Sequence, residues 1–164
     1  MIKKINLFLI KTNRPLFLIC IVVFGIFLNV SLSLFAYYFL ETDFWKENET
    51  SFFLSKAMEY ILVVFIAPLI ETAIFQYLLI VLILKHFSYR NKQIQIILLL
   101  IISSLFFALM HLYSIYYFII AFIMGLYFGY ITLLSEFFRE RKINIFISVF
   151  LTHSMINFVA MIFD

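Results

Sequence analysis

The feature that most constrains this chain is a stretch of 43 residues, from Gln93 to Ser135, without a single formally charged side chain. As one helix it would be about 64 Å long at 1.5 Å per residue, about twice the ~30 Å hydrocarbon core of a bilayer. We therefore expect the stretch to cross a membrane twice, with a break near His111–Ile115. Its apolar residues do not alternate with polar ones, which argues against the strands of a membrane barrel and favours helices.

The composition of the whole chain agrees with a membrane location. Its residues are 66% hydrophobic and 13% charged, whereas a soluble domain is nearer one-half apolar and one-quarter charged. A domain of this size could not bury so much apolar surface by itself, so lipid is the expected partner. The sequence predicts one all-α membrane domain over residues 1–164, a polytopic bundle of about five transmembrane helices. The predicted spans are at about 15–40, 58–84, 94–112, 115–135 and 143–163.

The positions of the basic residues predict the orientation, because lysine and arginine gather on the cytoplasmic side. A cytoplasmic N-terminus puts two basic residues, Lys46 and Lys56, on the outer side. It puts ten on the cytoplasmic side: Lys3, Lys4, Lys11, Arg14, Lys85, Arg90, Lys92, Arg139, Arg141 and Lys142. We expect a multi-pass protein of the plasma or inner membrane, with cytoplasmic loops at 85–92 and 136–142. The basic residues are scattered, which excludes a nucleic-acid partner.

Four residues within the predicted spans stand out as polar groups that are costly to place in lipid: Glu71, His111, His153 and Asn157. A charged residue at the centre of a membrane helix costs about 2.5–3.5 kcal/mol, so such residues are functional candidates. Glu71, His111 and His153 lie about 20, 22 and 15 Å from the cytoplasmic edge at 1.5 Å per residue, and Asn157 shares a helix face with His153. This matched depth predicts one buried site, although each residue alone could be an interhelical hydrogen-bond partner.

Other polar or small residues have simpler interpretations. Pro68 removes a helical hydrogen bond and so frees a backbone carbonyl. In one interpretation a polar group or water satisfies that carbonyl. In the other, the proline is only a kink that helps the helices to pack. Gly125 and Gly129 form a G-x-x-x-G motif that permits close helix contact. Glu59 and His86 are expected at the membrane boundaries.

Three short motifs occur in order along the chain: Glu71 with Thr72 and Gln76, Phe107 with His111, and His153 with Asn157. They resemble the E-E-x-x-x-R, F-x-x-x-H and H-x-x-x-N motifs of the CPBP (Abi) family of intramembrane proteases, the CAAX prenyl and bacteriocin-processing enzymes. The resemblance covers about residues 60–160. The first motif departs from the family, because Thr72 and Gln76 replace a glutamate and an arginine that can pair four residues apart. A Thr72–Gln76 hydrogen bond could replace that ion pair.

The resemblance implies an intramembrane endopeptidase, similar to CAAX prenyl proteases, that acts on a peptide or prenylated protein. Glu71, helped by His111, would activate water, while His153 and Asn157 would donate hydrogen bonds to the oxyanion. No cofactor is favoured. Zinc bound by Glu71, His111 and His153 is the alternative, although no H-E-x-x-H helix is present.

Rival functions are not enzymatic. A small protein of this family could be a membrane immunity or adaptor protein whose polar residues only join helices. A transporter component would also contain a membrane carboxylate, but the sequence shows no internal repeat. A serine nucleophile is disfavoured, because Ser103 and Ser104 have no carboxylate-oriented histidine evident in sequence.

Overall fold

The computed structural model describes residues 14–40, 55–83, 92–137 and 144–163. Over these ranges the chain forms helices joined by turns and no strand, which confirms the predicted all-α membrane bundle. The helices are α2 (Arg14–Leu40), α6 (Lys92–Leu109), α7 (Ile115–Phe137), α8 (Ile145–Phe163) and a composite helix. The composite helix consists of α3 (Lys56–Ile61), η2 (Leu62–Ile66), α4 (Ala67–Glu71) and η3 (Thr72–Leu82), of which η2 and η3 are π-helical.

Three of the helices begin at a residue whose side chain caps the first turn. Oxygens of Ser55, Ser114 and Asn144 accept the backbone amide three residues later, at 3.3, 3.1 and 3.2 Å. Serine and asparagine are preferred at this position because the first amides of a helix have no partner inside it. Ser114 thereby begins α7 within the predicted break of the long uncharged stretch.

The helices expose apolar side chains on the outside of the bundle. Phe24, Phe27 and Tyr38 are more than half exposed, and a surface of this kind fits lipid, not water. Among the described residues, three helices are long and apolar enough to cross a bilayer, at Pro15–Phe39, Lys56–Val81 and Ile115–Leu134. Two shorter apolar helices, Gln93–Leu109 and Phe146–Ile162, complete the bundle.

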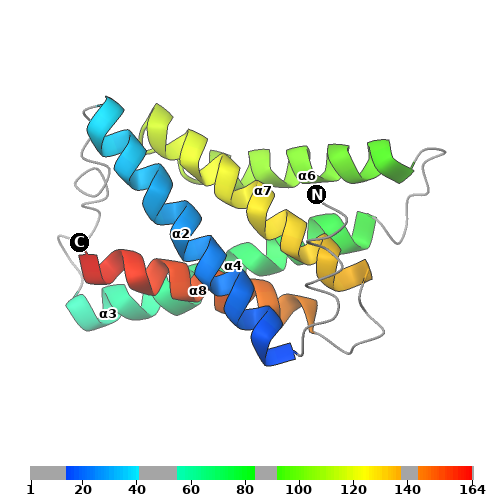
Figure 1. Cartoon of the computed structure of the whole chain (residues 1–164), viewed down its shortest axis with the longest axis horizontal. Coiled ribbons are helices and arrows are strands. Elements are labelled where there is room, and N and C mark those ends of the chain that lie inside the picture. The colour runs from blue at the N-terminus through cyan, green and yellow to red at the C-terminus, as the bar shows by residue number, and fades with distance from the viewer. Residues whose placement is uncertain (1–13, 41–54, 84–91, 138–143, 164) are drawn as a thin grey trace.

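The ends of these helices lie on two opposite sides of the bundle (Figure 1). One side, here the Arg14 side, holds Arg14, Leu82, Lys92, Phe137 and Ile145. The other, the Leu40 side, holds Leu40, Lys56, Leu109, Ile115 and Phe163. Most of the basic residues, His86 and nearly all of the predicted loops at 85–92 and 136–142 lie outside the described residues, so the cytoplasmic location of the Arg14 side stays a prediction.

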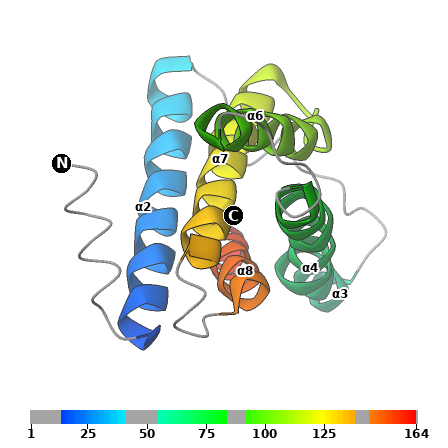
Figure 2. The same ribbon diagram turned by 90° about the vertical axis from the view of Figure 1, so that its right-hand side faces the viewer.

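The centre of the bundle is α7, which lies between α2 and the composite helix (Figure 2). In the most apolar 18-residue stretch of α7, 61% of the residues are buried, against 22% in that of α2 and 28% in that of the composite helix. Phe128 and Ile131 of α7 pack against buried side chains such as Phe107 and Val149. Because lipid is as apolar as this core, close packing and interhelical hydrogen bonds hold such a bundle together. The Tyr127 hydroxyl, for example, donates to the backbone carbonyl of Ile21 in α2.

Gly125 permits the close approach of α7 to α6 that its motif predicts. A Cβ at Gly125 would lie 2.9 Å from the Cα atom of Ser104, whereas one at Gly129 would lie 2.7 Å from the methyl tip of Leu100. A leucine tip can move more readily than a helix backbone. We therefore expect Gly125→Ala to lower the free energy of unfolding by about 1–3 kcal/mol, and Gly129→Ala by less. Thermal unfolding of both variants in detergent measures the difference, and equal losses would contradict this account.

Candidate active site

Glu71 lies where the composite helix changes its hydrogen-bonding pattern. It is the last residue of α4, and the π-helical segment η3 begins at Thr72. Turns of π-helix are rare and occur frequently at functional sites. In the preceding π-helical segment η2, the amide of Ala67 donates to the carbonyl of Leu62, five residues earlier. The next pair in this series would be Pro68 with Val63, but proline has no N–H.

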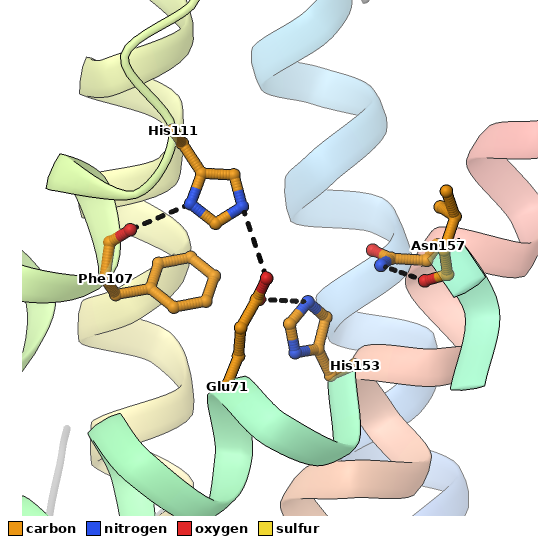
Figure 3. Close-up of polar contacts among 6 residues, drawn as sticks. Glu71, Phe107, His111, His153 and Asn157 are labelled. Carbon is orange, nitrogen blue, oxygen red and sulfur yellow. Dashed lines mark hydrogen bonds and ion pairs between the residues drawn. The ribbon is translucent and has the colours of Figure 1, made fainter. Parts of the chain in front are cut away.

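Asn157 supplies the hydrogen bond that Pro68 cannot. Its Nδ2 donates to the Val63 carbonyl at 2.9 Å, from α8 to the composite helix (Figure 3). This contact supports the interpretation of Pro68 as a break satisfied by a polar partner, over a simple packing kink. The carbonyl also fixes which end of the Asn157 amide faces it, and leaves the second N–H of that amide for another acceptor.

A double-mutant cycle can test whether Asn157 replaces the backbone hydrogen bond that Pro68 cannot form. Asn157→Ala should lower the free energy of unfolding by roughly 1 kcal/mol, because the Val63 carbonyl then loses its partner. In a Pro68→Ala background an amide becomes available at position 68, so the same Asn157→Ala change should cost less. Thermal unfolding of the four proteins in detergent gives the coupling. Equal losses in both backgrounds would show that Pro68 does not create the need for Asn157.

His111 lies beyond the end of its helix, which corrects the prediction that a span over 94–112 carries it. Helix α6 ends at Leu109, and residues 110–113 form a turn. The Phe107 carbonyl accepts the backbone amide of Met110 at 3.2 Å and, with its second lone pair, His111 Nδ1 at 2.8 Å. A carbonyl can only accept, so Nδ1 carries the hydrogen, and in a neutral ring Nε2 carries the lone pair. The F-x-x-x-H spacing therefore sets the orientation and the tautomer of this ring.

The Glu71 carboxylate lies between the two histidines (Figure 3). Its Oε1 is 3.9 Å from Nε2 of His111, and its Oε2 is 3.6 Å from Nε2 of His153. Both separations exceed a direct hydrogen bond, and catalytic contacts often tighten only when substrate binds. The Glu71 and His111 side chains are 18% and 16% exposed and that of His153 is 6% exposed. The pair Glu71–His111 is thus the more accessible from the cavity.

All four residues predicted for the site line one cavity of about 240 Å³: Glu71, His111, His153 and Asn157. Aromatic rings hold the two histidines. Tyr117 stacks on His111 with centroids 5.6 Å apart, and Phe128 packs on His153 at 4.5 Å. Nothing in the sequence distinguishes these two rings from the many other aromatic residues of α7.

Glu59 also lines the cavity, together with Val63, Ala67 and Glu71 of the same helix. These residues follow one another at intervals of four. In an uninterrupted α-helix, 12 residues would rotate Glu59 about 120° away from Glu71. The wider π-helical turns of η2 reduce this rotation, so both carboxylates reach the same cavity. The expectation that Glu59 is only an interfacial residue is therefore incomplete. The one sign of its role in the sequence is that Glu59, Val63, Ala67 and Glu71 follow one another four residues apart.

Thr72 and Gln76 do not line the cavity, and the suggested hydrogen bond between them is absent. Both side chains are buried, at 1% and 2% exposure. Gln76 Oε1 instead accepts from Ser103 Oγ of α6 at 3.4 Å, while Thr72 Oγ1 and Gln76 Nε2 have no hydrogen-bond partner among the described residues. Ser103 of α6 reaches the composite helix, where its single O–H points mainly to the Phe75 carbonyl at 2.8 Å and makes only the longer contact with Gln76.

Two further predictions concern nucleophiles and metals. Ser103 and Ser104 are buried and lie outside the cavity lining, in keeping with the argument against a serine nucleophile. Within the described ranges, no three histidine, cysteine, aspartate or glutamate side chains are grouped so that they could hold a metal ion. Zinc bound by Glu71, His111 and His153 stays the alternative prediction.

Comparison with known proteins assigns the chain to a family. The family model described as type II CAAX prenyl endopeptidase Rce1-like matches residues 53–159, a range that includes every residue of the candidate site. No curated protein and no solved structure matches the chain. The match confirms the resemblance to CPBP proteases, and the chain therefore belongs to the Rce1-like family of membrane-embedded endopeptidases.

Proposed function

We propose that this protein hydrolyses peptide bonds of membrane-associated substrates in the plasma or inner membrane, with Glu71 as the general base. One observation carries the proposal: a carboxylate within the bundle faces two histidines and borders a cavity. A membrane carboxylate that served only to join helices would not require an adjoining space of about 240 Å³. The family assignment supports the same class of reaction.

The first step needs a water activated near Glu71. A water within hydrogen-bond reach of Glu71 Oε1 and His111 Nε2 would lose its proton to the carboxylate as its oxygen bonds the carbonyl carbon. The lone pair of His111 Nε2 would hold the second hydrogen of that water, an arrangement that the Phe107 carbonyl prepares. Glu71 would then pass the proton to the leaving amine as the C–N bond breaks.

The negative charge that develops on the carbonyl oxygen needs hydrogen-bond donors. The proposed donors are His153 and the second N–H of Asn157. Asn157 is held by Val63, and His153 by the rings of Phe107 and Phe128. Donors fixed in this way need little reorganisation when charge develops. The substrate is a peptide or, as in the family description, a prenylated protein.

A cleavage screen tests the proposal. Purified protein in liposomes would be mixed with peptide and prenylated-peptide libraries beside the Glu71→Gln variant, and products identified by mass spectrometry. Cleavage by the wild type alone supports a Glu71 protease. Equal product with both proteins would refute the role of Glu71, and no product from either would favour the immunity or adaptor alternative.

The metal-free form of the proposal makes a separate prediction. We expect hydrolysis to continue after dialysis against a strong chelator, because Glu71 and the histidines act without an ion. The rate before and after dialysis, with metal content measured by mass spectrometry, checks this. A rate that falls on chelation and recovers when zinc is added would overturn it and assign the histidines as ligands.

A further inference from the structure

The cavity is lined mainly by one half of each contributing helix. Helix α2 contributes Asn29, and Phe128 and His153 lie just past the midpoints of α7 and α8. In the composite helix the lining residues lie between Glu59 and Glu71, and none lies in η3. In α7 they lie between Tyr117 and Phe128, and in α8 between His153 and Met161. Helix α6 contributes only Phe107 to the lining. The turn that follows α6 contributes His111 and Tyr113.

These halves all belong to the same side of the bundle. Tyr117 is close to the start of α7, Met161 is close to the end of α8, and Glu59 is close to the start of α3. Each of these helix ends lies on the Leu40 side (Figure 1). The cavity therefore occupies the Leu40 half of the bundle, and Glu71 and His153 are its lining residues farthest from that side within their helices.

The opposite half of the bundle is packed. Ile80, Ile131 and Val149 fill it, and each is at most 1% exposed. Gln76 of the composite helix lies in the same half and contacts Ser103 of α6. Among the described residues that lie farther toward the Arg14 side than Glu71, Phe128 and His153 in their helices, none lines the cavity, so a peptide that comes from the Arg14 side would have to displace a closely packed core.

The charge distribution assigns the two sides to compartments. Ten basic residues belong to the segments that join or precede helix ends on the Arg14 side, and two belong to those on the Leu40 side. The Leu40 side also has the acidic residues Glu41, Asp43, Glu47 and Glu49 in its first connecting segment. The positive-inside rule places the Arg14 side in the cytoplasm. The cavity would then face the opposite compartment.

We infer that the cavity receives substrate from the non-cytoplasmic side of the membrane. Its substrates are peptide segments that emerge from the bilayer on that side, such as the stretch that follows a membrane anchor. Glu59 and Tyr113 lie along the entry path. This inference rests on the proposed function for its substrate class, but the side of entry can be measured without any catalysis.

Cysteine labelling tests the side of entry. Cys20 is the only native cysteine and does not line the cavity, so Cys20→Ser provides the background. Tyr113→Cys and Ala160→Cys, on two different segments of the lining, would report on the cavity. Phe27→Cys is the matched control, because it is exposed on the outside of the bundle and faces lipid. Arg139→Cys marks the predicted cytoplasmic side.

A membrane-impermeant maleimide would be added to right-side-out and to inverted vesicles. We expect Tyr113→Cys and Ala160→Cys to react only in right-side-out vesicles, Arg139→Cys only in inverted ones, and Phe27→Cys in neither. Reaction of the cavity cysteines from the cytoplasmic face, or from neither face while they react in detergent, would overturn the inference. Because no substrate is needed, an inactive protein would still give the answer, which separates this test from that of the proposed protease.

Discussion

Replacing Glu71 with glutamine is expected to lower the rate of peptide hydrolysis by roughly 10²–10⁴-fold, the contribution usual for a positioned general base. Glutamine has nearly the same shape and can still bond water, but its amide oxygen cannot hold the proton that water must lose. The fold should survive, because the change removes a charge from the membrane interior, where charge is costly. The thermal unfolding temperature in detergent should therefore be unchanged or higher.

The cavity offers a matched control for this experiment. Glu59→Gln makes the same chemical change in the same helix and the same cavity, but Glu59 has no histidine partner at ion-pair distance among the described residues. It should leave the rate of hydrolysis at a given substrate concentration within a few-fold of wild type. If Glu59→Gln reduced the rate as much as Glu71→Gln, the loss would reflect the charge of the cavity and not a base at Glu71.

The largest expected effects on stability come from restoring the family residues at positions 72 and 76 one at a time. Thr72→Glu would bury a carboxylate at a site that is 1% exposed, and Gln76→Arg would bury a guanidinium at one that is 2% exposed. An unpaired buried charge costs about 3–5 kcal/mol. The Gln76→Arg change also removes the longer of the two contacts of the Ser103 hydroxyl, which keeps the Phe75 carbonyl as its acceptor. We expect both single variants to unfold at clearly lower temperature.

The double variant should recover much of this loss, since residues four apart on a helix lie on one face. A favourable coupling of about 0.5–3 kcal/mol is expected for two charges in contact. Thermal unfolding of the wild type, both single variants and the double variant in detergent gives this value. Losses that simply add would show that the two positions do not interact. Thr72 and Gln76 would then be independent departures from the family pattern.

The all-α membrane fold and the grouping of the site residues could be predicted from sequence because both depend on long-range physical limits. A bilayer fixes how many apolar residues a span requires, and the cost of charge in lipid singles out Glu71. Depth along each helix then placed Glu71, His111 and His153 at one level, and the structure brings them to one cavity. Residue type and position along a helix axis are enough to make both predictions.

What could not be predicted depends on rotation about that axis and on local hydrogen bonds. Sequence reasoning assumed the α-helical period, so it missed that π-helical turns bring Glu59 into the cavity. It paired Thr72 with Gln76 because they are neighbours on a helix, while the structure pairs Gln76 with Ser103 of another helix. It also extended a span through His111, since nothing in an apolar run marks where the last helical hydrogen bond forms.

The hydrogen bond from His111 to the Phe107 carbonyl limits the sequence changes that the family can accept during evolution. The acceptor belongs to the backbone, so every amino acid at position 107 provides it, and substitutions there should alter only how the neighbouring rings pack. An insertion or deletion between Phe107 and His111 would instead separate the ring from its acceptor at the end of α6. Divergent relatives should therefore vary in the identity of the three residues between Phe107 and His111, but scarcely in their number.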